Sequence, residues 1–94
     1  MRALIWGGTF VRALKRTLRK NPSLQQDIEN TLRLLAEDPF VPQLATHKLK
    51  GKLAGSWACS VTYDLRIVFD FVKSPDQDED DILLLAIGSH NEVY

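Results

Sequence analysis

The sequence predicts an α+β fold in the order β-α-α-β-β-β, with two N-terminal helices packed on one face of a mostly antiparallel sheet. Two patterns carry this prediction. Apolar residues recur at helical spacing between residues 10 and 37, and they alternate with polar residues between 57 and 72, ahead of an unbroken apolar run at 82–87. Because both helices would cover the same face of the sheet, we expect the opposite face to be open for a partner or a substrate.

Length and composition fit a single small domain spanning residues 1–94. Ninety-four residues can bury one core, and a hydrophobic share of 45% is that of an ordinary globular chain. No apolar run is long enough to span a bilayer, and the first residues lack the features of a signal peptide. The single cysteine, Cys59, cannot form an internal disulfide. We therefore expect a cytoplasmic protein that does not associate with membranes.

The N-terminal part is predicted to contain one strand and two helices. The strand covers residues 2–6, and the first helix runs from about Phe10 to Lys20 with Thr9 as its N-cap. Proline disfavours a helical residue before it and suits the first helical position, so the second helix runs from about Pro22 to Glu37. The apolar stripes of the two helices consist of Phe10, Val11, Leu14 and Leu18 and of Leu24, Ile28, Leu32 and Leu35. This pattern predicts an αα-hairpin laid on the sheet.

The segment 57–72 is predicted to be an antiparallel hairpin whose odd-numbered apolar side chains face the core. Both strands can do so only if the loop has an odd number of residues, because a slip of one residue turns every side chain to the other face. A three-residue loop at 63–65, which pairs Thr62 with Arg66, meets this condition. The polar outer face would then gather Ser60, Thr62 and Arg66, with Asp64 at the tip.

The last predicted strand, Ile82–Ile87, is apolar throughout, as expected for a central strand that is covered on both faces. A hydrophilic loop at 73–81 precedes it and holds five of the twelve acidic residues. This loop lacks the glycine and the terminal glutamate of an EF-hand, so we expect a solvated loop and not a calcium site.

The formal net charge is zero, but the charges are unevenly distributed. Outside the acidic loop, twelve basic residues face seven acidic ones, and the basic residues cluster at 12–20 and at 48–52. A local basic surface can bind phosphate groups on a protein that is neutral overall. For the cluster at 12–20, a solvated surface and a phosphate or partner contact are equally compatible with the sequence.

The sequence contains few candidate catalytic or metal-binding residues. His47 and His90 lie far apart in the chain, with no cysteine or histidine at the spacing of a metal site, so we expect no metal. Histidine, arginine and lysine are suited to acid–base chemistry on an anionic substrate, although a single histidine is more often a surface or capping residue. Cys59 lies at an apolar-face position and is predicted to be a buried structural thiol.

Four segments are more specific in combination than any one of them alone: His47–Gly51, Trp57–Val61, Tyr63–Phe69 and Ile87–Tyr94. In this order they resemble the RelE/ParE superfamily of bacterial toxin–antitoxin toxins, closest to the RelE/StbE and YafQ-like branch. Toxins of this branch end in Gly-x-His followed shortly by an aromatic residue, and here Gly88, His90 and Tyr94 match that pattern. The resemblance covers essentially the whole chain and implies a RelE-like fold.

The resemblance also implies an activity and partners. Toxins of this branch are ribosome-dependent endoribonucleases, or mRNA interferases, that cleave messenger RNA in the decoding site of the 70S ribosome and so arrest translation. Their cleavage needs no metal or cofactor: the 2′-hydroxyl attacks the adjacent phosphate in line and leaves a 2′,3′-cyclic phosphate and a free 5′-hydroxyl. The resemblance further implies a separate cognate antitoxin protein that wraps the toxin.

Matched by position, the resemblance assigns the site to a small set of residues. The catalytic set is His90, Asp64, Arg66, Tyr94 and His47, and the RNA-binding set is Lys48, Lys50 and Lys52. His90 matches the acid–base histidine and Tyr94 the terminal aromatic residue. Arg66 suits stabilisation of phosphorane charge. Ser60 and Leu65 stand where YafQ-like toxins carry a further histidine and a tryptophan.

Two alternatives remain open at the level of sequence. One is a toxin of the ParE type, which acts on DNA gyrase without cleaving RNA and would not need His90 or Arg66. The other is a catalytically decayed member that still binds its antitoxin.

Overall fold

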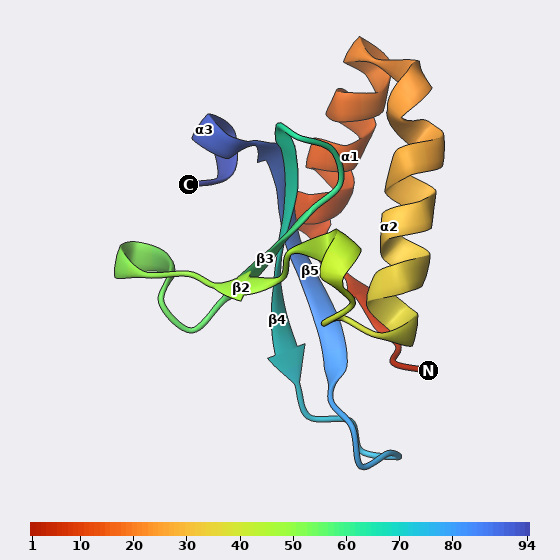
Figure 1. Ribbon diagram of the computed structural model, residues 1–94, viewed down its shortest axis with the longest axis vertical. Helices are drawn as coiled ribbons and strands as arrows, with labels where there is room; N and C mark the ends of the chain where they lie inside the picture. Colours follow the sequence, from red (N-terminus) through yellow and green to blue (C-terminus); the bar gives the residue numbers. More distant parts are fainter.

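The computed structural model describes residues 1–94, and its five strands form one mixed sheet (Figure 1). The strands are β1 (Leu4–Trp6), β2 (His47–Lys48), β3 (Trp57–Ser60), β4 (Leu65–Val72) and β5 (Asp81–Ser89). Their order in the sheet is β1-β5-β4-β3-β2, with β1 parallel to β5 and all other neighbours antiparallel. The predicted α+β class and the mostly antiparallel sheet are confirmed, while the two-residue strand β2 was not predicted.

Two long helices cover one face of this sheet, α1 (Gly8–Lys20) and α2 (Gln25–Glu37) (Figure 1). A third helix of a single turn, α3 (His90–Val93), follows β5 and lies on the other side of the sheet, as does the loop that projects after β2. This arrangement confirms that the two predicted helices share one face. None of the helices combines the length and the apolar composition needed to cross a membrane.

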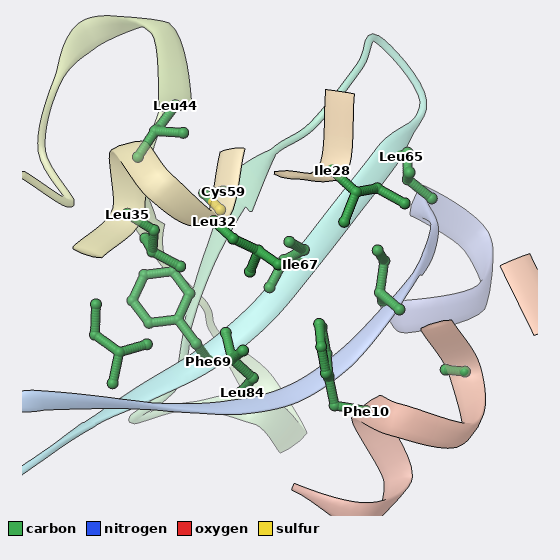
Figure 2. Close-up of a cluster of buried hydrophobic side chains, with 13 residues drawn as sticks. Phe10, Ile28, Leu32, Leu35, Leu44, Cys59, Leu65, Ile67, Phe69 and Leu84 are labelled. Atoms are coloured by element: carbon green, nitrogen blue, oxygen red, sulfur yellow. The ribbon is translucent and has the colours of Figure 1, made fainter. Parts of the chain in front are cut away.

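The core fills the space between the helices and the sheet (Figure 2). Its largest side chains with no appreciable exposure come from every layer: Phe10 of α1, Leu35 of α2, Phe69 and Ile67 of β4, and Ile82 and Leu84 of β5. Burial of such a side chain stabilises the fold by about 1.5–3 kcal/mol. The predicted apolar stripes of both helices therefore do face the sheet.

Helix α1 begins two residues earlier than predicted, at Gly8, and its N-cap is Gly7 and not Thr9. The sheet fixes this start, because the Gly7 N–H donates to the Leu84 carbonyl (3.1 Å) and the Gly7 carbonyl accepts from Val11 N–H (3.0 Å). The Thr9 hydroxyl instead accepts from Arg12 (3.2 Å). Pro22 opens a 3₁₀ turn, Pro22–Leu24, that leads directly into α2.

The β3–β4 hairpin has the predicted faces but a different pairing. Ser60 pairs with Arg66, so the predicted partner Thr62 was wrong by two residues and the loop is 61–65. This wider loop is closed by the Leu65 carbonyl, which accepts from Val61 N–H (2.9 Å). A shift of two residues preserves the odd-numbered core face, as the period of a strand requires. Tyr63 was expected on that face, but it lies in the loop and is 96% exposed.

Strand β5 contains an irregularity that decides what faces the core. Its register against β4 shifts between Val68, which pairs with Ala86, and Phe69, which pairs with Leu84. Leu84 and Ile87 can therefore both point into the core although one is even-numbered and the other odd. On the opposite face Leu83 and Ala86 are only half-buried, so the predicted full cover on both faces holds for the helix side alone.

Cys59 lies on the core side of β3 with no exposed surface, as predicted. Burial raises the pKa of its thiol to about 12. Because the thiolate is the reactive form, we expect the native protein at pH 8 to resist alkylation by iodoacetamide and to be alkylated rapidly once guanidinium unfolds it. Intact-mass spectrometry of both samples checks this, and fast alkylation of the folded protein would contradict the placement.

Candidate functional site

The sheet face opposite α1 and α2 carries a cavity of about 490 Å³ between β2, the loop after it and the C-terminal residue. Its lining consists of His47, Lys48, Leu49, Lys50, Lys52, Leu53 and Tyr94. Gly51 and Gly55, at φ values of 69° and 98°, let the lysine-bearing loop fold back on itself. The structure therefore places all three predicted RNA-binding lysines beside His47 and Tyr94. Leu49 and Leu53, whose apolar side chains alternate with the lysines, were not predicted to line the site.

His47 presents a defined tautomer to this cavity. It is exposed on β2, and its Nδ1 atom lies 3.0 Å from the Ala45 carbonyl oxygen. Since a carbonyl oxygen can only accept, Nδ1 carries the hydrogen in this contact. In the neutral ring Nε2 is then an unprotonated acceptor. His47 is thus arranged to accept a proton from a bound group.

His90 and Tyr94 lie on α3 and its C-cap, one turn apart, with ring centroids 4.5 Å from each other in an edge-to-face arrangement. The Tyr94 ring also lies 6.5 Å from that of His47. Tyr94 therefore lies between the two histidines, which are 43 positions apart in the sequence. Burial raises the pKa of Tyr94, and the nearby Arg66 charge only partly opposes this effect. The phenol consequently keeps its proton and can donate a hydrogen bond.

Arg66 supplies positive charge to the same face. It alternates with the core-facing Ile67 on β4, as predicted, and its Nη1 donates to the carbonyls of Thr62 (2.8 Å) and Leu65 (3.3 Å). No carboxylate forms a salt bridge with it. Its positive charge lowers the pKa of Tyr94 and so partly opposes the effect of burial. The loop carbonyls thus hold Arg66 in place while its charge remains available to a phosphate.

Helix α3, which was not predicted, determines where His90 and Tyr94 lie. A capping box opens it: the Ser89 hydroxyl accepts from Glu92 N–H (3.3 Å) and the Glu92 carboxylate accepts from Ser89 N–H (2.8 Å). The His90 N–H donates to the Asp64 carbonyl (3.1 Å), which ties α3 to the hairpin loop. At Gly88 a Cβ atom would stand 3.1 Å from that of Glu92, so any other residue would require α3 to shift by a few tenths of an ångström from the strand. The sequence does contain the signal, since Ser-x-x-Glu is the capping-box signature.

The capping box makes the order of α3 dependent on Glu92. Hydrogen bonds from Ser89 lower the pKa of Glu92 below its usual 4.5, so the box is intact above that value and is lost as the pH falls through the lowered pKa. We expect Glu92→Ala to increase hydrogen exchange at the His90 amide at neutral pH. The wild type should show the same increase only below pH 4.5. Glu92→Gln, which retains the box, is the matched control; equal protection in all three proteins at neutral pH would contradict this role.

Asp64 differs from the other predicted catalytic residues. Its backbone carbonyl accepts from His90 N–H, and Asp64 lines a second cavity, of about 310 Å³, whose lining includes none of His47, Arg66, His90 or Tyr94. Arg16 and Lys20 of the basic cluster on α1 line this second cavity as well. The structure therefore groups His47, His90 and Tyr94 through their ring contacts, while Asp64 lines a different cavity.

The first cavity combines the groups needed for proton transfer on an anionic substrate. Its lining includes the His47 imidazole with a free acceptor nitrogen, the protonated Tyr94 phenol and three lysines, and the His90 imidazole packs against the Tyr94 ring. Such a set can remove and supply protons while positive charge stabilises a developing oxyanion. None of these steps needs a bound metal.

Comparison with known proteins gives a consistent result. The family model described as "Bacterial toxin of type II toxin-antitoxin system, YafQ" matches residues 2–94. Among solved structures, YafQ from Escherichia coli strain BL21(DE3) aligns with 16% identity and a TM-score of 0.77, covering 100% of this chain and 99% of the other. YafQ in the E. coli DinJ-YafQ complex aligns with the same values. No curated protein matches at the sequence level.

A third solved structure, a YoeB/ParE toxin from Agrobacterium tumefaciens, aligns with 22% identity and a TM-score of 0.74 over 94% of this chain and 98% of that one. At such identities the structural matches establish a shared fold. The family match extends over almost the entire chain.

Proposed function

Because this chain belongs to the YafQ family of toxins of bacterial type II toxin–antitoxin systems, we propose that it is a ribosome-dependent endoribonuclease that cleaves messenger RNA in the decoding site and so arrests translation. The observation that supports this proposal most strongly is the grouping of His47, His90 and Tyr94 beside a lysine-lined cavity. An RNA strand is the anionic substrate that this surface suits. The protein would act in the cytoplasm, on the 70S ribosome.

The proposed reaction is transfer of the phosphate from the 5′-oxygen of one nucleotide to the 2′-oxygen of the preceding one. His47 Nε2 removes the proton from the attacking 2′-hydroxyl, and the new P–O bond forms in line with the bond that breaks. His90 gives a proton to the departing 5′-oxygen. The products are a 2′,3′-cyclic phosphate and a 5′-hydroxyl, so no water, metal or cofactor enters the balance.

Arg66 and Tyr94 would act on the pentacovalent phosphorane. Arg66 is held by two loop carbonyls, so its charge is positioned before the substrate arrives and needs little rearrangement during the reaction. The protonated Tyr94 phenol can donate to a phosphate oxygen, and its ring can stack on a base. Lys48, Lys50 and Lys52 would bind the neighbouring phosphates.

The proposed partner is a cognate antitoxin. YafQ of E. coli, which shares this fold, is found in a complex with DinJ that is described as a toxin-antitoxin complex. By analogy, a small protein encoded with this chain would bind it and suppress cleavage. Antitoxins that order on binding can cover large surfaces of this kind.

Primer extension on a defined mRNA tests the proposed activity. We expect purified protein without a C-terminal tag to cut the message at a fixed codon phase when 70S ribosomes are present, and to leave the same RNA intact when they are absent. The cut ends should carry a 2′,3′-cyclic phosphate. If a folded protein makes no cuts, the nuclease proposal fails, and a gyrase supercoiling assay on the same preparation then distinguishes a ParE-type toxin from a decayed one.

A further inference from the structure

We propose that the second cavity, on the other side of α3, is a nucleotide subsite in which Asp64 recognises the amino group of a base. The inference rests on the nuclease proposal above and adds to it the origin of a sequence preference. The cavity measures about 310 Å³, within the range of about 300–1,000 Å³ that is typical of ligand sites. It is lined by the end of α1, the turn after it, the hairpin loop and the start of α3.

Charges of both signs line this cavity without forming a salt bridge. Arg16 and Lys20 stand on α1 and Asp64 on the hairpin loop, and no pair of them comes within salt-bridge distance. The other carboxylate of the cavity, Glu92, is engaged in the capping box, and the charges of Lys20 and Arg16 help to lower its pKa. Asp64 is therefore the carboxylate of this cavity that has neither a hydrogen bond nor a salt bridge.

A nucleotide has the complementary arrangement of charges. Its phosphate is an anion that suits Arg16 and Lys20, and its base, at the other end, carries hydrogen-bond donors that suit Asp64. A carboxylate accepts hydrogen bonds from the exocyclic amino group of cytosine or adenine, whereas uracil presents a carbonyl at the same position. Polar side chains that could contact ribose or base edges complete the lining: Thr17, Asn21, Thr62 and Ser89. Leu24 and Leu65 add apolar surface for a base.

The cavity is adjacent to the proposed catalytic cavity. Helix α3 carries His90 and Tyr94 beside the first cavity and Glu92 in the second, and its first amide is bonded to the carbonyl of Asp64. An RNA strand that crosses this single helical turn can place one nucleotide on each side. The subsite would thus hold a nucleotide next to the scissile bond, and Asp64 would favour an amino-bearing base there.

Cytosine and uracil give the sharpest comparison, because at the C4 edge they differ by an amino group against a carbonyl. We expect the wild type to cut messages with C at one position flanking the scissile phosphate about tenfold faster than otherwise identical messages with U. Asp64→Asn should abolish or reverse this ratio, since an amide can pair with either base. Asp78→Asn, in the exposed acidic loop, is the matched control and should keep the wild-type ratio.

Three results would overturn the proposal. One is a wild type that cuts C and U messages equally at both flanking positions. Another is an Asp64→Asn protein that is slower on all messages with an unchanged ratio and an altered pH–rate profile, which would place Asp64 in the catalytic set, as the resemblance implies, with a role in proton transfer. The third is binding of an antitoxin peptide in the cavity with no selectivity between nucleotides.

A binding measurement separates this subsite from the nuclease proposal. In NMR titrations of the full chain, 5′-CMP should shift the amide signals of Lys20 and Asp64 at lower concentrations than 5′-UMP, and Asp64→Asn should remove the difference. This result would support the subsite even if the protein made no ribosomal cuts. Equal or absent shifts would overturn the subsite while leaving the nuclease proposal standing.

Discussion

Replacing His90 with alanine is expected to lower the rate of ribosome-dependent mRNA cleavage by about 10²–10⁴-fold, the usual contribution of one general acid–base group. The side chain is exposed and contacts the Tyr94 ring, so its removal takes away a proton donor without opening a hole in the core. Expression of the variant should accordingly no longer arrest growth. Single-turnover cleavage on programmed 70S ribosomes measures the change directly.

The neighbouring variant Asn91→Ala is the control for this measurement, because Asn91 is also exposed on α3 and its side chain forms no hydrogen bond with either histidine or with Tyr94. It should cut at close to the wild-type rate. Circular dichroism and antitoxin binding should show both variants folded. A stable His90→Ala protein that still arrests growth and cuts at the wild-type rate would refute the assignment of His90.

Replacing Phe69 with alanine is expected to lower the free energy of unfolding by about 3–5 kcal/mol, the usual cost of Phe→Ala in a core. Phe69 lies in the middle of β4 with no exposed surface, and its ring centroid is 5.4 Å from that of Phe71. Domains of this size are stable by only about 5–15 kcal/mol, so a large part of the total stability would be lost. Urea denaturation followed by tryptophan fluorescence gives the difference.

Tyr63→Ala is the control for core truncation, since it removes an aromatic ring that is 96% exposed. Its effect should stay within about 0.5 kcal/mol, as is usual for surface positions. Similar losses for the two variants would mean that Phe69 is not part of the core that holds the sheet to the helices.

The fold could be predicted from the sequence because its patterns have fixed periods. The apolar stripes at helical spacing identified both long helices, and alternation gave the correct face to Arg66 even though the pairing was wrong by two residues. The length of the hairpin loop was harder to predict from the sequence. Hydrogen bonds within the loop, such as that from Val61 N–H to the Leu65 carbonyl, determine where strand pairing begins. Strand β2 has only two residues, too few to show alternation.

The candidate site could be predicted only as a set of residues. Family resemblance selected His47 and His90, but their meeting around Tyr94 depends on how β2 and α3 lie over the open face of the sheet, which no local pattern encodes. The cavity that Asp64 lines could likewise not be predicted from the sequence, because a loop residue has no periodicity that assigns its side chain to a face. The short helix that carries His90 was detectable from Ser89 and Glu92, the two ends of its capping box.

The parallel pairing of β1 with β5 also determines when this protein can fold during its own synthesis. The bonds from Ile82 N–H to the Ala3 carbonyl and from Gly7 N–H to the Leu84 carbonyl join segments separated by nearly eighty positions. Until β5 leaves the ribosomal tunnel, β1 has no neighbour and α1 lacks the strand that it packs against. Contacts so distant in sequence slow folding. The segment that completes the core leads directly into His90 and Tyr94, so a nascent chain becomes stable and forms the contact between these two rings in the same late step.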